Sequence, residues 1–368
     1  RHLGLMLGRL AELDDADKET RHLALAEARA DALILTGRNS EGAAMLRLLE
    51  TQVPAVVDQA RLLRKRGMAL LRTSDPGRGI EALKGTLRLL GDGMPHSRWG
   101  RYMRLARDLV AAGFRRFLPG RSTDGRLDER AIVHSELAIV HRWIDLVDSA
   151  GFLAAFQHLA YRSAKLAHRV DADAFAVLYF AFQGMPGVAR ALERSAREVA
   201  VRTGDAVGLA RLEIVLGGSA VLLREDEAAF AHLDEGVRLA RETGDGYLLN
   251  FALSSRGWGR TMLGRWDAAS ADFSQAVVLA EELGTTWLAA DATCGQLAID
   301  TALGNFDDVS RSARAMLGSE VRLVFPVVEA LASEALSGVA FLTGRYEDAV
   351  RGYERTHRLY ERNRLHRG

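Results

Sequence analysis

The chain has 368 residues, of which 48% are hydrophobic and 26% charged, and its formal net charge is +1. This length is too great for one ordinary hydrophobic core, so the chain forms several domains or is a repeat array that lengthens without enlarging its core. A charge this close to zero argues against bulk attraction to nucleic acid, and the single cysteine, Cys294, excludes an internal disulfide framework and a multi-cysteine zinc site.

The sequence is dominated by alanine, leucine, arginine and glutamate, which favour helices. It contains no signal peptide and no apolar run long enough to cross a bilayer, which favours a cytoplasmic protein without a membrane partner. The first residue is Arg1 rather than methionine, and both ends stop within helix-like sequence, so we expect a piece of a longer protein.

Residues 1–90 are expected to form N-terminal helical repeats. Thr36-Gly37-Arg38 separates two stretches with helical periodicity, and a glycine in the left-handed conformation commonly ends a helix. A second turn, residues 73–77, follows about one repeat later, and its Pro76 suits the first turn of the next helix.

Residues 91–126 interrupt this pattern with a helix-breaking segment, a basic helix and a loop rich in glycine, serine and aspartate. An arginine recurs at every third position of the helix, and the spacing suggests a basic stripe that docks onto an acidic surface of an attached or partner domain. The stripe consists of Arg98, Arg101, Arg104 and Arg107. The alternative is a solvated helix face enriched in arginine by a GC-rich genome, and nucleic acid is the least favoured partner.

Helical pairing resumes at residue 127 and continues to residue 368. Early in this region, His134 and His141 lie on one helix near Glu136, Asp145 and Asp148. Histidines seven positions apart share a face two turns apart, whereas a metal pair on one helix needs a spacing of three or four. We therefore interpret these residues as structural and expect no metal site.

Two markers then recur every 40 residues. The first is a glycine followed by an aromatic residue and an acid, at Gly264, Gly304 and Gly344; Arg224 occupies the equivalent position one period earlier and Gly184 the one before. The second consists of 203–205, 243–245 and 283–285, where glycine ends one helix and the next residue, Asp or Thr, caps the following one. Each period is therefore a helix, a turn, a helix and a turn, with helices of about 16 to 18 residues.

The unit around Gly264 resembles a tetratricopeptide repeat. That family places a small residue before the turn glycine and alanine, an aromatic residue and alanine after it, and this chain has Gly257, Ala269, Phe273 and Ala276 there. The period exceeds the family's standard of about 34 residues, and the usual proline is absent. The resemblance implies an all-α fold, a right-handed α-solenoid of tetratricopeptide-like helical hairpins with a period of about 40 residues.

The stretch from Leu89 through Pro95 and Phe117 to Pro119 resembles part of the tetratricopeptide-like region of bacterial multidomain STAND-type signalling ATPases, which are linked to kinase, cyclase or regulator domains. This resemblance implies a non-catalytic sensor or protein-interaction region that binds a peptide, a small-molecule inducer or a partner domain and regulates attached domains. The alternative is a free-standing tetratricopeptide adaptor that binds a peptide or protein.

In tetratricopeptide arrays the first helix of each pair lines the concave face. Mapping from Gly257 places Phe251, Ser254, Trp258 and Thr261 on one such helix, with Arg211 and Asp291 on its neighbours. Aromatic, hydroxyl and charged groups together are typical of a ligand- or partner-binding groove. The alternative is that Phe251 and Trp258 pack between helices, as most large aromatic residues do.

The sequence contains no Gly-Lys-Ser or Gly-Lys-Thr phosphate-binding loop, no His-Glu-x-x-His motif and no Gly-x-Ser-x-Gly elbow. We therefore expect no catalytic residues and no cofactor in this chain, although an ATPase or kinase domain can precede it in the full-length protein.

Overall fold

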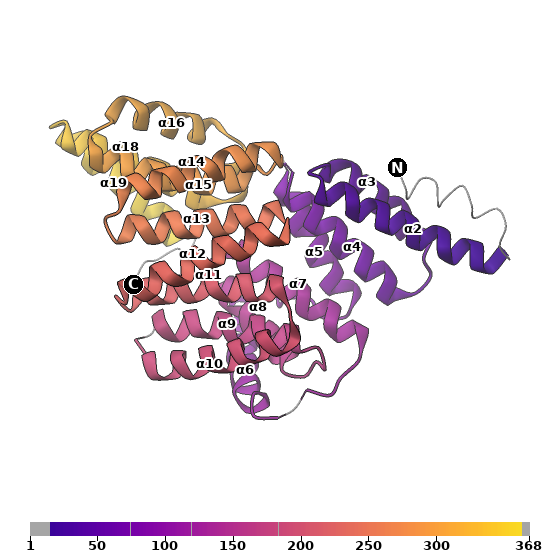
Figure 1. The fold of residues 1–368 in the computed structure, drawn as a ribbon. Coiled ribbons are helices and arrows are strands. Elements are labelled where there is room, and N and C mark those ends of the chain that lie inside the picture. The colour runs from indigo at the N-terminus through magenta and orange to yellow at the C-terminus, as the bar shows by residue number, and fades with distance from the viewer. Residues whose placement is uncertain (1–14, 74, 119, 183, 363–368) are drawn as a thin grey trace. The chain divides into compact units, whose positions relative to one another are not determined.

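The computed structural model describes residues 15–73, 75–118, 120–182 and 184–362, and within them it contains eighteen helices and no strand (Figure 1). Consecutive helices form hairpin pairs joined by short turns, so the predicted all-α, tetratricopeptide-like solenoid is confirmed. The chain divides into two compact units, one of residues 1–93 with 282–285 and the other of the remaining residues. Within the described residues, each helix is too short or too polar to span a bilayer.

The first unit contains two helix pairs. They are α2 (Asp15–Leu35) with α3 (Asn39–Glu50), and α4 (Val56–Leu71) with α5 (Pro76–Leu89). Gly37 has a φ of 79°, and Pro76 is the first residue of α5, as both turn motifs predict. Helices α4 and α5 approach closely at Gly67 and Gly79, where a Cβ on Gly79 would meet the Gly67 carbonyl oxygen at 2.8 Å.

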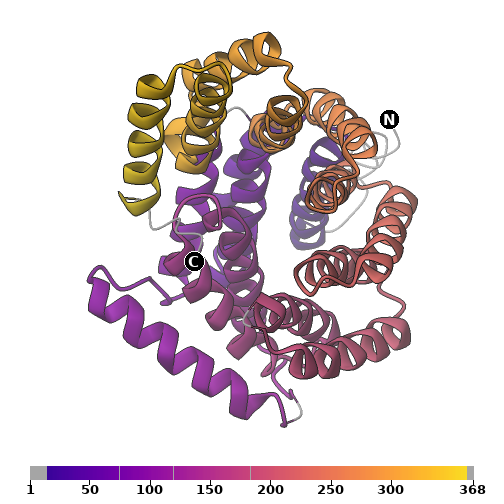
Figure 2. The same cartoon turned by 90° about the vertical axis from the view of Figure 1, so that its left-hand side faces the viewer.

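The second unit begins with α6 (Arg98–Arg115), which packs on α8, and continues as six pairs. The pairs are α7 (Gly125–His141) with α8 (Leu146–Ala160), α9 (Leu166–Phe182) with α10 (Pro186–Thr203), α11 (Ala206–Leu222) with α12 (Asp226–Thr243), α13 (Gly246–Met262) with α14 (Trp266–Glu282), α15 (Thr286–Leu303) with α16 (Phe306–Gly318), and α18 (Pro326–Leu342) with α19 (Tyr346–Arg362). Figure 2 shows the helices from α9 onwards nearly end-on, following one another along a curved row.

The turn glycines adopt the conformation that the 40-residue register predicts. Every marker glycine, from Gly184 to Gly344, has a φ between 64° and 83°. Arg224, in the position that lacks glycine, has a φ of 61° and is the only non-glycine residue with positive φ in the described part of the chain. Asp205 and Asp245 cap α11 and α13 as expected, whereas the buried Thr285 hydroxyl has no hydrogen-bond partner among the described residues and does not act as a cap.

The helix length predicted from the spacing is wrong in one place. Helix α16 ends at Gly318 after 13 residues, and the four-residue α17 (Val321–Val324) leads to Pro326 at the start of α18. Ser319 leaves the helical conformation with an extended backbone and Pro326 suits the first turn of α18, so this pair is interrupted where its neighbours are continuous.

The residues that carry the tetratricopeptide resemblance form the packing contacts between helices. Ala269, Phe273 and Ala276 of α14 are all fully buried. A Cβ on Gly257 of α13 would lie 2.7 Å from the Phe273 ring, and one on Gly295 of α15 would also collide with that ring. Two glycines on neighbouring helices therefore make room for one aromatic side chain.

The first helices of successive pairs, α9, α11, α13, α15 and α18, pack against one another and form a continuous inner layer. This layer presents the predicted groove residues of α11, α13 and α15.

Candidate functional site

Three of the predicted groove residues lie together on the inner layer. Ser254 and Trp258 stand one turn apart on α13, and the indole Nε1 of Trp258 donates a hydrogen bond to Asp291 Oδ1 on α15 at 3.3 Å. Ser254 and Asp291 are buried, and Trp258 is half-buried with its ring edge-on to Phe273, 5.6 Å between centroids. Trp258 therefore contacts both the core and the candidate site.

Asp291 is an acid in a poorly solvated place. Burial raises the pKa of its carboxyl group, while the charge of Arg142 and the hydrogen bond from Trp258 act in the opposite direction. One turn further along α15, burial and the charge of Asp291 raise the pKa of the Cys294 thiol. A cationic group or a hydrogen-bond donor of a ligand would therefore compete with little water for this carboxylate.

Arg142 completes the group, and the sequence analysis missed it. It follows the last residue of α7. The residue as a whole is exposed, but its guanidinium group lies among protein atoms, with the guanidinium carbon 5.8 Å from the centroid of the Phe251 ring and 5.7 Å from that of Trp143. The surrounding protein lowers the pKa of Arg142 by desolvation, and the charge of Asp291 favours its protonated form. We call Arg142, Phe251, Ser254, Trp258 and Asp291 the inner-face cluster.

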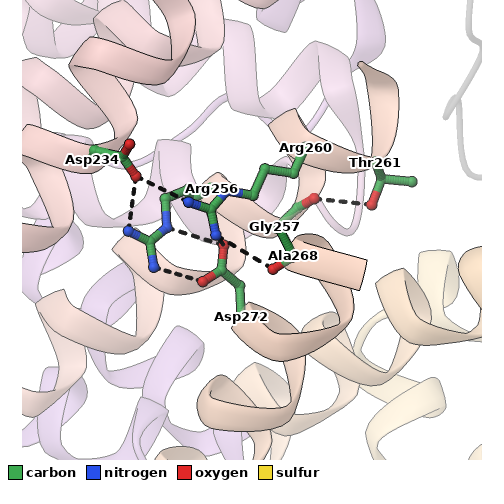
Figure 3. Close-up of polar contacts among 7 residues, drawn as sticks. All are labelled: Asp234, Arg256, Gly257, Arg260, Thr261, Ala268 and Asp272. Carbon is green, nitrogen blue, oxygen red and sulfur yellow. Dashed lines mark hydrogen bonds and ion pairs between the residues drawn. The ribbon is translucent and has the colours of Figure 1, made fainter. Parts of the chain in front are cut away.

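Two predicted groove residues do not join the inner-face cluster. Arg211 pairs with Asp171 on α9, 3.2 Å between Nη2 and Oδ2, and burial raises the pKa of Asp171 to about 6 in spite of this partner. The Thr261 hydroxyl donates to the Gly257 carbonyl oxygen of its own helix at 2.9 Å (Figure 3).

An ion-pair network holds α13 from the opposite side of the helix (Figure 3). The buried carboxylate of Asp272 on α14 accepts from Arg256 Nη2 at 2.6 Å and from Arg260 Nη1 at 2.8 Å. The same two arginines donate to the exposed Asp234 on α12, at 2.9 and 3.1 Å. The network therefore ties α12, α13 and α14 together and fixes the rotation of α13, which carries Ser254 and Trp258.

The four arginines of the basic stripe do not share one helix face. A spacing of three residues turns each side chain back by roughly 60° relative to the one before, so the four spread around half of the helix. Arg101 pairs with Asp148 of α8 at 2.9 Å, and the buried Arg104 pairs with Asp108 at 3.4 Å. Arg98 and Arg107 remain exposed, with Arg107 also contacting Asp108 at 2.7 Å.

The histidines of α7 pack in the core. His134 and His141 are buried on either side of Phe152, with ring centroids 5.7 and 4.8 Å away, and His141 Nδ1 lies 3.1 Å from the Leu137 carbonyl oxygen. In the described parts of the chain, no group of three His, Cys, Asp or Glu residues is arranged to hold a metal ion.

No protein-family model and no curated protein matches the chain. Among solved structures it is similar to a Rap protein complexed with competence and sporulation factor, at 13% identity over 93% of this chain and 98% of that one, with a TM-score of 0.49. It is similar to aspartyl phosphate phosphatase F from Bacillus subtilis at 11% identity, over 92% and 93% of the chains, with a TM-score of 0.46.

A STAND protein with a tetratricopeptide repeat sensor, from Pyrococcus horikoshii, is 14% identical over 93% of this chain but only 52% of its own, with a TM-score of 0.47. At these identities and scores the likenesses concern the helical-repeat arrangement alone.

Proposed function

We propose that the chain is a non-catalytic binding scaffold that takes an extended peptide segment of a partner, including one acidic group, on the inner helices of its second unit. The observation that supports this proposal is the Arg142 guanidinium, which lies 5.8 Å from the centroid of the Phe251 ring and whose charge acts on Asp291, the hydrogen-bond partner of Trp258.

The chemistry of the inner-face cluster favours this class of ligand. An arginine that packs beside aromatic rings has its guanidinium N–H groups available to bind a carboxylate in a bidentate manner. Phe251 and Trp258 offer apolar contact area, and Asp291 accepts from a ligand N–H group. The continuous inner layer suits an extended segment better than a compact metabolite, because stacked repeats present long surfaces.

The test is an array of short synthetic peptides, each made with a free carboxyl terminus and as the amide, and with or without Asp and Glu. We expect the wild-type chain to capture carboxylate-bearing peptides and Arg142→Gln to bind them at least about tenfold more weakly. The matched control is Arg238→Gln, an exposed arginine on α12 that pairs with Glu235 and Glu242. Equal capture by wild type and Arg142→Gln, or no capture of any peptide by the folded chain, would contradict the proposal.

A sensor role is the second proposal, and it is supported by the resemblance of residues 89–119 to the tetratricopeptide-like region of STAND-type signalling ATPases. Its test is ATP hydrolysis by the full-length protein, with and without a peptide that the array selects. A changed rate supports regulation of attached domains, whereas an unchanged rate leaves the adaptor role.

A further inference from the structure

Helix α6 exposes a row of apolar side chains on its outward side, and charged side chains lie on the side that packs on the second unit. Arg104 and Asp108 are buried, and Arg101 pairs with Asp148 of α8. The outward residues, spaced three or four apart, are Trp99, Met103, Ala106, Val110, Phe114 and Phe117, which we call the α6 face. Trp99 is 76% exposed, Phe114 72% and Phe117 84%. An ordinary amphipathic surface helix has the reverse distribution, so the α6 face needs a partner.

Basic side chains border the α6 face. Helical geometry places Arg98 and Arg107 on its two sides, and both are exposed. The apolar face therefore has an exposed arginine on each side, and Arg107 also contacts the carboxylate of Asp108 at 2.7 Å.

An apolar cavity of about 270 Å³ lies beside the α6 face, between α6, α8, α9 and α10. Its lining includes Leu109, Gly113 and Phe117 from α6 and its end, with Leu153 of α8 and Phe180 of α9. An apolar cavity of about 150 Å³ holds a benzene molecule, so this one has room for part of a hydrocarbon chain. Phe117 belongs to both features, which makes the cavity continuous with the α6 face.

We propose that the α6 face docks the protein onto an anionic lipid bilayer. The bordering arginines would contact lipid phosphates, and the aromatic and aliphatic residues would enter the boundary between headgroups and acyl chains, as in helices that lie in the membrane interface. Tryptophan is enriched at this depth, and phenylalanine is common on the apolar face of helices that lie there.

A bilayer fits the observations better than a protein helix does. An anionic bilayer supplies phosphates on both sides of the α6 face for the exposed arginines, and the apolar cavity beside the face suits a flexible hydrocarbon chain. The sequence analysis predicted no membrane partner from the lack of an apolar run long enough to span a bilayer. That criterion does not detect a helix that lies on the membrane surface.

The experiment is flotation of the purified chain with vesicles of phosphatidylcholine alone and with vesicles that also contain phosphatidylglycerol. We expect binding only to the anionic vesicles, weakened by added salt. Val110→Glu and Phe114→Glu should each reduce binding at least about tenfold, and Arg98→Gln by about fivefold, because one arginine near an anionic surface contributes about that factor. The matched control is Leu323→Glu, which places the same charge at an exposed leucine of α17 and should bind like wild type.

Circular dichroism and thermal melting of each variant show whether it is folded. Absence of binding by the folded wild-type chain, or equal loss in Leu323→Glu, would overturn the proposal. Light scattering after gel filtration tests the other occupant: a wild-type dimer that Val110→Glu converts to a monomer would assign the α6 face to a second copy of the chain instead.

Discussion

Replacing Asp272 by asparagine tests whether the network around α13 holds the repeats together. Asp272 is 1% exposed and receives hydrogen bonds from two arginines that are themselves mostly buried. The neutral amide would leave both guanidinium groups without their buried counter-charge, and breaking a buried ion pair from one side costs about 3 to 5 kcal/mol. Asp234 still faces both arginines, so we expect the loss of unfolding free energy to be about 2 to 4 kcal/mol.

The matched control is Asp234→Asn, which removes a carboxylate bound to the same two arginines but with a half-exposed side chain. Exposed ion pairs contribute about 0 to 1 kcal/mol, so this variant should remain close to wild type. Urea denaturation measures both changes. Because repeat arrays unfold in parts, hydrogen exchange in α12, α13 and α14 should report the loss locally. Equal stability of the two variants would refute the inference that the network fixes α13 in place.

Three further predictions follow from the backbone, the buried acids and the missing phosphate-binding loop. Arg224→Gly should raise the unfolding free energy by about 0.5 to 1 kcal/mol, because glycine adopts a positive φ without steric cost. Gly264→Ala should lower it by about 1 to 2 kcal/mol, because residue 264 has a φ of 73°. Thermal melts in which both variants shift in the same direction would contradict this reasoning. Asp171, with its pKa raised to about 6, binds its proton more tightly in the folded chain than in the unfolded chain. The unfolding free energy of the wild type relative to Asp171→Asn should therefore fall by up to about 3 kcal/mol as the pH rises from about 4 to about 7. Denaturation series at several pH values should show a difference between the two proteins that declines with pH. The isolated chain should neither hydrolyse ATP nor bind it, and calorimetric titration that detects micromolar Mg-ATP binding would contradict that expectation.

The sequence predicts the repeat well because the residues that begin and end each helix act locally. A left-handed glycine, an aspartate cap or a proline at the start of a helix acts within one turn, so the register could be followed even to Arg224, where the glycine is missing. The interrupted pair at Gly318 was missed because the 40-residue period gives no information about where one member of the series departs from it.

The candidate site was predictable only in part. Ser254, Trp258 and Asp291 follow from the repeat register, since equivalent positions on adjacent first helices face the same side. Arg142 lies far away in sequence and in a less regular pair, and nothing about its own neighbours distinguishes it from the chain's many other arginines. The arginines from Arg98 to Arg107 recur every three residues, a period that drifts around a helix, whereas the outward apolar residues follow the true period of 3.6.

Phe273 is shared by three helices, since its ring fills space left by Gly257 on α13 and Gly295 on α15. A larger side chain at either glycine therefore requires a smaller side chain at residue 273. A smaller side chain at residue 273 in turn leaves a void that borders both glycines. These three positions should change together or not at all as the sequence diverges. Because Trp258 packs edge-on against the same ring, the position of the indole above Asp291 would inherit any such change.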